Sequence, residues 1–338
     1  MSYGLMSFGV ALGAAVPVEE VIGEYTEDRE RILGYGVRTI HRAAPGVGVT
    51  DLAVKAGLQA LASAAIGPAE IDLLVFATTD LTEHLYWDAA ASLAHRLGAC
   101  RAEAVLLTQA CTTGVAALDT VAGKFATHPG YQTALVVAAN RTCEAYWNRM
   151  DTQPVIFSDG AVATVARRGH PSLRWLTTEI HTNGQFADFF RLNVGGAAAP
   201  FGAAADGEAP RVSDAWDILE FFDYDPTRFE AFAYELDANS REVVVRACAR
   251  AGIDIADLAM VFTLSDSVAA MISLAKVLDI PLERTNLELS ARHGHLGAAD
   301  QLLGLHQSRA DGVLTDGDRV ALIARGRGMH WACTLIEV

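Results

Sequence analysis

The predicted order of strands and helices occurs twice along the chain, and this repeat constrains the fold more than any other feature. In the first half, a helix that begins near Thr50 precedes a buried apolar strand over 71–78. In the second half, a helix again precedes a buried strand, here over 257–263. Alternating helices and strands build α/β sheets, and self-similarity of this kind indicates duplication. We therefore predict a duplicated α/β protein with an N-terminal half, residues 1–170, and a C-terminal half, residues 171–338.

The same sequence patterns lead to three local predictions. Thr50 has a side chain suited to the N-cap of the first long helix. In the second half, residues 286–290 are expected to form a strand, followed by a turn and a helix over 297–307. The segment Gly195–Pro210 is rich in alanine and glycine and is expected to form a flexible loop or lid.

A cysteine lies where a predicted strand passes into a predicted helix. Residues 104–107 are apolar, Cys111 is followed by Thr-Thr-Gly, and an alanine- and leucine-rich helix begins soon after. A thiol at this position lies near the positive end of the helix dipole, which favours the thiolate. A buried structural cysteine is the common alternative. The strand–cysteine–helix setting favours a nucleophile, and we predict that Cys111 is one.

The second half offers a histidine for this thiol. The segment Ser290–His295 occupies the strand-to-helix junction that corresponds to the junction around Cys111. Pseudo-twofold packing of the two halves would bring the two junctions together at the centre of the molecule. A histidine is the usual general base for a thiol or a hydroxyl.

Composition and charge exclude several classes of function. The 338 residues are 51% hydrophobic, enough for a large core, and the formal net charge is −15. This charge argues against nucleic acid or an anionic membrane surface as a partner, and no apolar run is long enough to span a bilayer. Five widely spaced cysteines without a Cys-x-x-Cys pair predict a reduced, cytoplasmic protein with no metal site.

Several motifs together resemble the thiolase superfamily, and specifically its ketoacyl-acyl-carrier-protein synthase III branch, over essentially the whole chain. They are residues 71–79, Ala110–Gly114, Phe157–Ala161, Arg292–Gly294 and Gly326–Trp331. The resemblance implies a duplicated, five-layered αβαβα fold, a homodimer, and acyl transfer through a cysteine thioester. It also implies an acyl-coenzyme A or acyl carrier protein thioester as the donor and no other cofactor.

Two positions depart from the pattern of the condensing enzymes in this branch. Their catalytic histidine corresponds to Thr263 here, and their catalytic asparagine corresponds to His295. Without both hydrogen-bond donors, decarboxylative C–C bond formation should be crippled. Cys111, His295 and Asp300 remain, a set suited to acyl transfer onto oxygen, with Asp300 orienting the imidazole.

This departure resembles the ketosynthase III-like acyltransferases of polyketide antibiotic pathways, including ester-forming malonyltransferases that act on glycosides. We therefore expect a short acyl group, such as malonyl, to move to a hydroxyl acceptor such as a deoxysugar. A starter-unit condensing enzyme and a catalytically silent partner subunit are the alternatives.

The resemblance also suggests further site residues. The N–H groups of Cys111 and Gly328 would form the oxyanion hole. Tyr86 and Trp87 fall in the loop that enters the partner's acyl pocket, although a plain interface role is equally compatible with them. Arg149 lies close in sequence to the position at which the family carries an arginine that contacts coenzyme A. Thr263 is expected to contact substrate.

Overall fold

The structure, a computed structural model, describes residues 2–151, 155–192, 195–200 and 218–338. Most of the predicted loop over 195–210 therefore lies outside the described residues. The strands are β1 (Tyr3–Leu12), β2 (Ala14–Pro17), β3 (Thr39–Arg42), β4 (Leu73–Thr78), β5 (Glu103–Leu107), β6 (Thr133–Asn140), β7 (Gly160–Arg168), β8 (Arg174–Thr182), β9 (Leu258–Phe262), β10 (Arg319–Gly326) and β11 (His330–Glu337).

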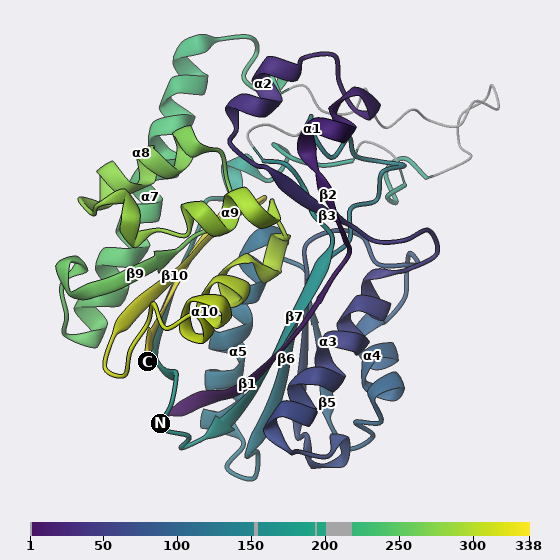
Figure 1. Ribbon diagram of the computed structural model, residues 1–338, viewed down its shortest axis with the longest axis vertical. Coiled ribbons are helices and arrows are strands. Elements are labelled where there is room, and N and C mark those ends of the chain that lie inside the picture. The colour runs from purple at the N-terminus through teal and green to yellow at the C-terminus, as the bar shows by residue number, and fades with distance from the viewer. Residues whose placement is uncertain (1, 152–154, 193–194, 201–217) are drawn as a thin grey trace.

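The helices cover the outside of the strands and fill the space between them (Figure 1). They are α1 (Val18–Val21), α2 (Arg29–Gly34), α3 (Val49–Ala64), α4 (Ala89–Leu97), α5 (Thr113–Thr127), α6 (Ile218–Phe221), α7 (Pro226–Ala251), α8 (Val268–Leu278), α9 (Leu287–His293) and α10 (Asp300–Ala310). Two short 3₁₀ turns matter for the site, η3 (Ala110–Thr112) before α5 and η8 (Gly297–Ala299) before α10.

The strand pairing repeats in the two halves. One part of the sheet runs β5-β4-β6-β7-β1 and the other β9-β10-β11-β8, and the two parts are joined where Gly4 of β1 pairs with Arg174 of β8. β4 and β6 are parallel, as are β9 and β10, and the next pairings in each part are antiparallel. The strands of the two parts therefore share one order and one set of directions, which is the duplication that the sequence predicts.

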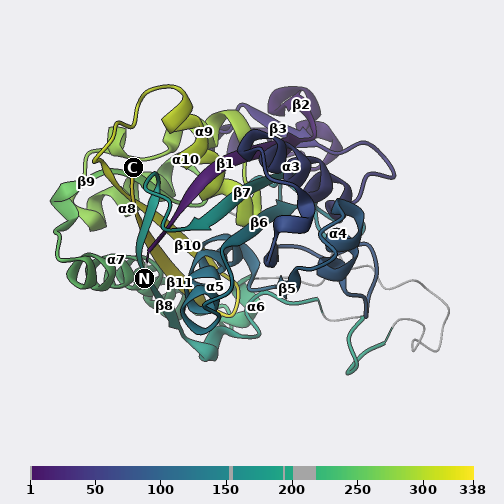
Figure 2. The ribbon, with the colours of Figure 1, turned by 90° about the horizontal axis from the view of Figure 1, so that it is seen from below.

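Helices and sheets alternate in five layers. α3 and α4 pack on the outer face of the first sheet, α5 and α10 contact both sheets, and α7 and α8 cover the outer face of the second (Figures 1 and 2). The predicted αβαβα fold is therefore present.

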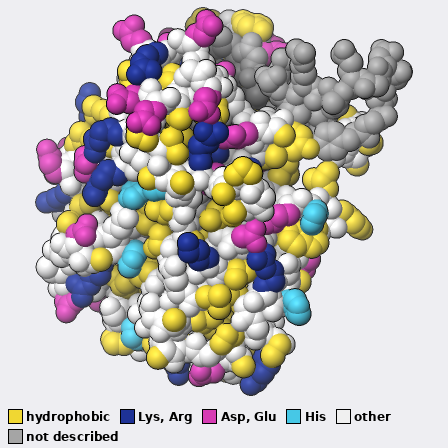
Figure 3. Space-filling model, turned by 45° about the vertical axis from the view of Figure 1, so that its right-hand side comes forward, with side chains coloured by type: hydrophobic (Ala, Val, Ile, Leu, Met, Phe, Trp, Pro, Cys, Tyr) yellow, Lys and Arg dark blue, Asp and Glu magenta, His cyan; other side chains and the backbone are white. Residues whose placement is uncertain are grey.

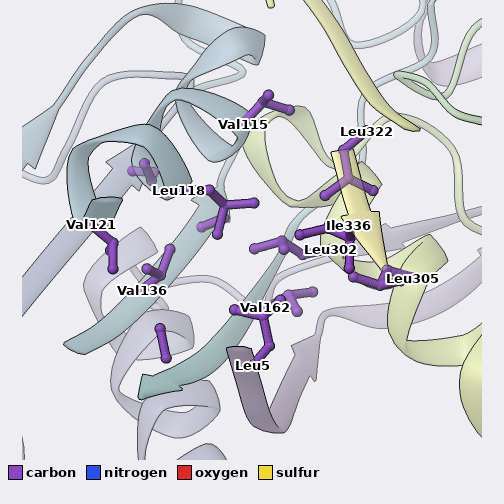
Figure 4. Packing of buried hydrophobic residues seen from close by; sticks show 14 of the residues in the cluster. Leu5, Val115, Leu118, Val121, Val136, Val162, Leu302, Leu305, Leu322 and Ile336 are labelled. Atoms are coloured by element: carbon purple, nitrogen blue, oxygen red, sulfur yellow. The ribbon is translucent and has the colours of Figure 1, made fainter. Parts of the chain in front are cut away.

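The central layer fixes the two inner helices against both sheets. Val115, Leu118 and Val121 of α5 and Leu302 and Leu305 of α10 are buried in one cluster with strands of both halves (Figure 4). Each such side chain contributes about 1.5–3 kcal/mol when it leaves water. The N-terminal ends of α5 and α10 are consequently held in fixed positions relative to each other.

Two local predictions were wrong. Residues 286–290 lie mostly in helix α9 rather than in a strand, because Leu, Glu, Ala and Arg favour a helix and the segment has no β-branched residue. One parallel bridge, Val261 to Thr285, remains where the strand was expected. Helix α3 begins at Val49 after Gly48, and Thr50 instead donates its N–H and hydroxyl to the Glu83 carboxylate at 2.7 and 2.8 Å.

The face shown in Figure 3 carries hydrophobic patches among separate acidic and basic side chains. Within the described residues, no helix combines the length and the apolar character needed to cross a bilayer.

Candidate active site

The Cys111 side chain lies at the start of α5 because of a tight turn. Ala110 has a φ of +51°, a left-handed conformation that is uncommon for a residue with a Cβ. The Thr112 hydroxyl donates to the Gln109 carbonyl at 2.5 Å, and the Thr113 hydroxyl donates to the Ala110 carbonyl. The turn leaves Cys111 partly exposed at the N-terminal end of the helix, as the sequence predicts.

His295 and Asp300 lie in line with the thiol. The imidazole Nε2 is 3.1 Å from Cys111 Sγ, and the imidazole Nδ1 is 2.5 Å from Asp300 Oδ2. A proton on Nδ1 that is donated to the carboxylate leaves Nε2 to exchange a proton with the sulfur. The three side chains therefore form a thiol–imidazole–carboxylate chain that joins the two halves of the molecule.

Asp300 is buried and fully occupied by donors, so it is not a solvated helix residue. Its Oδ2 accepts the Ser265 N–H at 2.7 Å as well as the imidazole, and its Oδ1 accepts the Leu296 N–H at 2.7 Å. These bonds fix the plane of the carboxylate and compensate it for burial. Asp300 can consequently orient His295 without rearranging.

The backbone of His295 is fixed by the Phe157–Ala161 motif. The His295 N–H donates to the Ile156 carbonyl, and its own carbonyl accepts the Ser158 N–H, both at 2.8 Å. The Phe157 ring lies 5.1 Å from the imidazole, centroid to centroid. The side chain of His295 is 1% exposed, so water has little access to it.

The pKa of His295 reflects competing influences. Burial alone lowers it, but the adjacent Cys111 and Asp300 outweigh burial and raise the pKa well above its ordinary value. The imidazole therefore holds its proton beside the Cys111 sulfur.

The glycine-rich segment passes beside the nucleophile. A Cβ on Gly326 would lie 3.0 Å from the Cys111 nitrogen and 3.1 Å from the Thr112 nitrogen, so a side chain at this position would crowd those N–H groups. The Gly328–Met329 peptide bond is cis, and Gly328 packs against the ring of His330. The oxyanion hole of Cys111 and Gly328 N–H groups stays a prediction.

The other predicted site residues lie in varied settings. Tyr86 is fully exposed and Trp87 is half-buried, with its ring against His84. Thr263 is buried at the end of β9, where its backbone N–H and carbonyl bond the Asn286 side chain at 2.8 and 2.9 Å. Contacts of these residues with substrate or a partner remain predictions.

Arg149 is buried and held by protein groups. Its guanidinium donates to Glu144, to both oxygens of Asp159 and to the Phe157 carbonyl, at 2.8–3.2 Å. It also lines a cavity of about 410 Å³ together with Arg42 and other residues. These bonds favour a structural role for Arg149. They do not support the predicted contact with coenzyme A, which stays a prediction.

His293, two residues before His295, has its ring nitrogens engaged by other side chains. They lie 3.0 Å from His41 Nε2 and 3.1 Å from Gln307 Oε1. Burial, with a contribution from His41, lowers the pKa of His293 to about 4.

Sequence reasoning missed the groups that hold the site together. The backbone donors Ser265 and Leu296 could not be found, because a backbone N–H has no sequence signal. It also missed Arg327, whose side chain leaves the glycine-rich segment and donates to the Thr79 carbonyl at 2.9 Å. An arginine between two glycines in that motif was the available signal.

A duplicated αβαβα fold with a cysteine at the entrance of a central helix defines a thiolase-like enzyme. Family models for 3-oxoacyl-[acyl-carrier-protein] synthase III match residues 107–184, and the C-terminal model of the same family matches residues 248–338. The β-ketoacyl-[acyl-carrier-protein] synthase III of Gloeobacter violaceus is 30% identical over 331 residues, which is 96% of each chain. The protein therefore belongs to the β-ketoacyl-[acyl-carrier-protein] synthase III family, whose enzymes act on acyl thioesters.

Solved structures show the same fold. ChlB3, named as an acyltransferase, superposes with a TM-score of 0.86 at 23% identity, covering 100% of this chain and 98% of that one. The 3-oxoacyl-(acyl carrier protein) synthase III of Pseudomonas aeruginosa superposes with a TM-score of 0.79 at 24% identity, with the same coverage.

Proposed function

We propose that this protein is an acyltransferase that moves a short acyl group, such as malonyl, from a coenzyme A or carrier-protein thioester to a hydroxyl acceptor without C–C bond formation. The acceptor we propose is a glycoside, such as a deoxysugar of a polyketide natural product. The observation that carries the proposal is the chain from Cys111 Sγ through His295 to Asp300, at 3.1 and 2.5 Å. This is the arrangement that moves protons between a nucleophile and an acceptor.

The first half-reaction loads the enzyme. Cys111 Sγ attacks the carbonyl carbon of the donor thioester, and the bond from that carbon to the donor sulfur breaks. The donor thiol leaves with the proton from His295 Nε2. Backbone N–H groups at Cys111 and Gly328 stabilise the oxyanion in this proposal.

The second half-reaction transfers the acyl group. Acylation removes the charge of the Cys111 thiolate, which is one of the two groups that raise the pKa of His295. The imidazole then loses its proton more readily and accepts one from the acceptor hydroxyl. The hydroxyl oxygen attacks the acyl carbon, and Cys111 departs as the thiolate beside the imidazolium.

The substituted positions disfavour condensation. Thr263 stands where the condensing enzymes carry histidine, and its backbone is held by Asn286. The ring nitrogens of His295 face Cys111 and Asp300. Neither position offers the His/Asn donor pair that stabilises a malonyl enolate. ChlB3 shares the fold and is named as an acyltransferase, so this fold accommodates the proposed activity.

We also propose that the enzyme is a homodimer. Leu85 and Tyr86 are exposed, at more than half and fully, in the loop where the family resemblance predicts a contact with the partner. Covering two large apolar side chains would favour association.

Intact-protein mass spectrometry after incubation with acyl thioesters tests the proposal. We expect a stable adduct on wild type and on His295→Ala but none on Cys111→Ala, with the malonyl carboxyl retained. Wild type alone should then transfer the acyl group to a glycoside. Release of carbon dioxide with a C–C product would instead establish the condensing enzyme that the named relatives represent. The absence of any adduct with coenzyme A and carrier-protein donors would favour a silent partner subunit.

A further inference from the structure

The surroundings of Cys111 include a cationic side chain that the proposed chemistry has not used. Arg327 follows Gly326, which packs against the Cys111 and Thr112 nitrogens. Its Nη2 donates to the Thr79 carbonyl at 2.9 Å. This single bond carries the guanidinium from the nucleophile's turn to the end of β4.

Thr79 links Arg327 to the turn that precedes α10. Its hydroxyl accepts the Ala298 N–H at 2.6 Å, in the turn that precedes α10. The Ala298 carbonyl in turn packs against Gly114, where an added Cβ would approach it to 1.9 Å. Arg327, which is partly exposed, is therefore linked through Thr79 and Ala298 to the start of α5 next to Cys111.

The neighbouring arginine provides a comparison. Arg325, at the end of β10, is neutralised by Asp266 at 2.7 Å and by Asp237 at 3.4 Å. Within the described part of the chain, Arg327 forms no ion pair, and its hydrogen bond to Thr79 uses one of its five N–H donors. The charge of Arg327 thus lacks a carboxylate partner in a protein that carries a formal net charge of −15.

Asp80 is an acid that senses the charge of Arg327, and both of its oxygens already accept backbone N–H groups. Its Oδ2 accepts the Cys143 N–H at 3.0 Å and its Oδ1 accepts the Leu81 N–H at 2.7 Å. Burial raises the pKa of Asp80, while these N–H groups and the charge of Arg327 act in the opposite direction. Asp80 therefore forms no hydrogen bond or ion pair with Arg327 within the described residues.

We propose that Arg327 binds the free carboxylate of a dicarboxylic acyl group, of which malonyl is the shortest, and so selects it over neutral acyl groups. The inference rests on the proposed function. A planar guanidinium pairs with a carboxylate through two parallel N–H···O bonds, which adds orientation to attraction. In this proposal the acyl chain on Cys111 extends toward the glycine-rich segment, whose Gly326 packs against the Cys111 nitrogen.

The same pairing would protect the carboxyl group. Decarboxylation converts the carboxylate to neutral carbon dioxide and leaves the electron pair on the adjacent carbon. An ion pair with Arg327 stabilises the carboxylate that must be lost, and Thr263 provides no histidine to stabilise the resulting enolate. Arg327 thus favours transfer of the intact malonyl group.

Paired loading rates test the inference. Malonyl-coenzyme A and isovaleryl-coenzyme A have acyl groups with the same branched skeleton of non-hydrogen atoms, but only the malonyl group carries a charge. The rate of adduct formation on Cys111 is measured by mass spectrometry for wild type, Arg327→Gln, Arg327→Lys and the matched surface control Arg292→Gln. Arg292 is an exposed arginine of α9, so its substitution makes the same change in charge away from Cys111.

We expect Arg327→Gln to slow malonyl loading by about 10- to 100-fold, as for loss of a charge-assisted pair, while isovaleryl loading stays within about twofold. Arg327→Lys should restore part of the malonyl rate, and Arg292→Gln should change neither rate. Unchanged isovaleryl loading also shows that the variant is folded. An equal fall for both donors, or no fall for malonyl, would overturn the inference while leaving acyl transfer intact. Failure of wild type to load either donor, or the corresponding carrier-protein thioesters, would overturn the proposed function as well.

Discussion

The two turns that lead into the central helices have the same shape and different chemistry. Each is a three-residue 3₁₀ turn, η3 before α5 and η8 before α10, and each begins with a left-handed residue, Ala110 at φ +51° and Gly297 at φ +59°. The second residue is Cys111 in the first turn and Ala298 in the second. In the second half, chemistry has moved to the flanks of the turn, to His295 before it and Asp300 after it. The two halves therefore share one backbone arrangement. The first half carries the nucleophile, and the second half carries the proton-transfer pair.

The first prediction removes the proton-transfer pair from the second turn. Asp300→Asn should slow acyl transfer to the acceptor by about 10³- to 10⁴-fold, because an amide does not hold the imidazole in the same tautomer. Single-turnover transfer from a preloaded enzyme measures this effect. Complete loading of Cys111, verified by mass spectrometry before transfer begins, and the circular dichroism spectrum serve as controls. A change of less than tenfold would show that Asp300 only supports the backbone at Ser265 and Leu296.

The second prediction separates the two turns physically. In Gly114→Ala, the new methyl group meets the Ala298 carbonyl at 1.9 Å, so the free energy of unfolding should fall by about 2–4 kcal/mol. Gly123→Ala on the same helix has open space around the added methyl group and should gain about 0.4–1 kcal/mol. Urea denaturation measures both. Equal effects of the two substitutions would contradict close packing between the turns.

The third prediction addresses the electrostatic link between the turns. Burial lowers the pKa of His295 and the two neighbours raise it, so Cys111→Ser should lower that pKa by removing the thiolate. The raised folded-state pKa stabilises the protein below the unfolded value of about 6.5, and this contribution is lost as pH rises through the folded value. The variant should therefore lose it at lower pH than wild type. Imidazole NMR titration measures the pKa directly, and an unchanged value would show that Asp300 alone sets it.

The fourth prediction has the smallest effect and makes the turns more alike. Ala110→Gly replaces a left-handed alanine by the residue type found at Gly297. Relief of backbone strain and the greater entropy of glycine in the unfolded chain oppose each other, so stability should change by less than about 1 kcal/mol. Thermal unfolding checks this expectation. A larger loss would mean that the Ala110 methyl group itself supports the turn.

The sequence predicted the duplicated fold because hydrophobic patterns repeat, and it placed Cys111, His295 and Asp300 where the structure brings them together. It failed at residues 286–290, where the analogy with the first half overrode the helix-forming composition of α9. It also failed at Thr50, because the Glu83 carboxylate comes from a loop that is distant in sequence. The burial and ion pairs of Arg149 could not be predicted from the sequence, because Glu144 and Asp159 contact that side chain only after folding. Local sequence patterns predict helices and strands, whereas contacts between residues distant along the chain depend on how those helices and strands pack.

The bond between Cys111 and His295 spans 184 residues of sequence, which has a consequence for synthesis on the ribosome. The N-terminal half emerges first, and helix α5 then lacks the second sheet against which it packs in the finished molecule. Until the segment with His295 and Asp300 emerges and packs, Cys111 lacks the imidazole that promotes its thiolate. An incomplete chain therefore carries the thiol without its proton-transfer partners, and the three-residue site is complete only in a finished molecule.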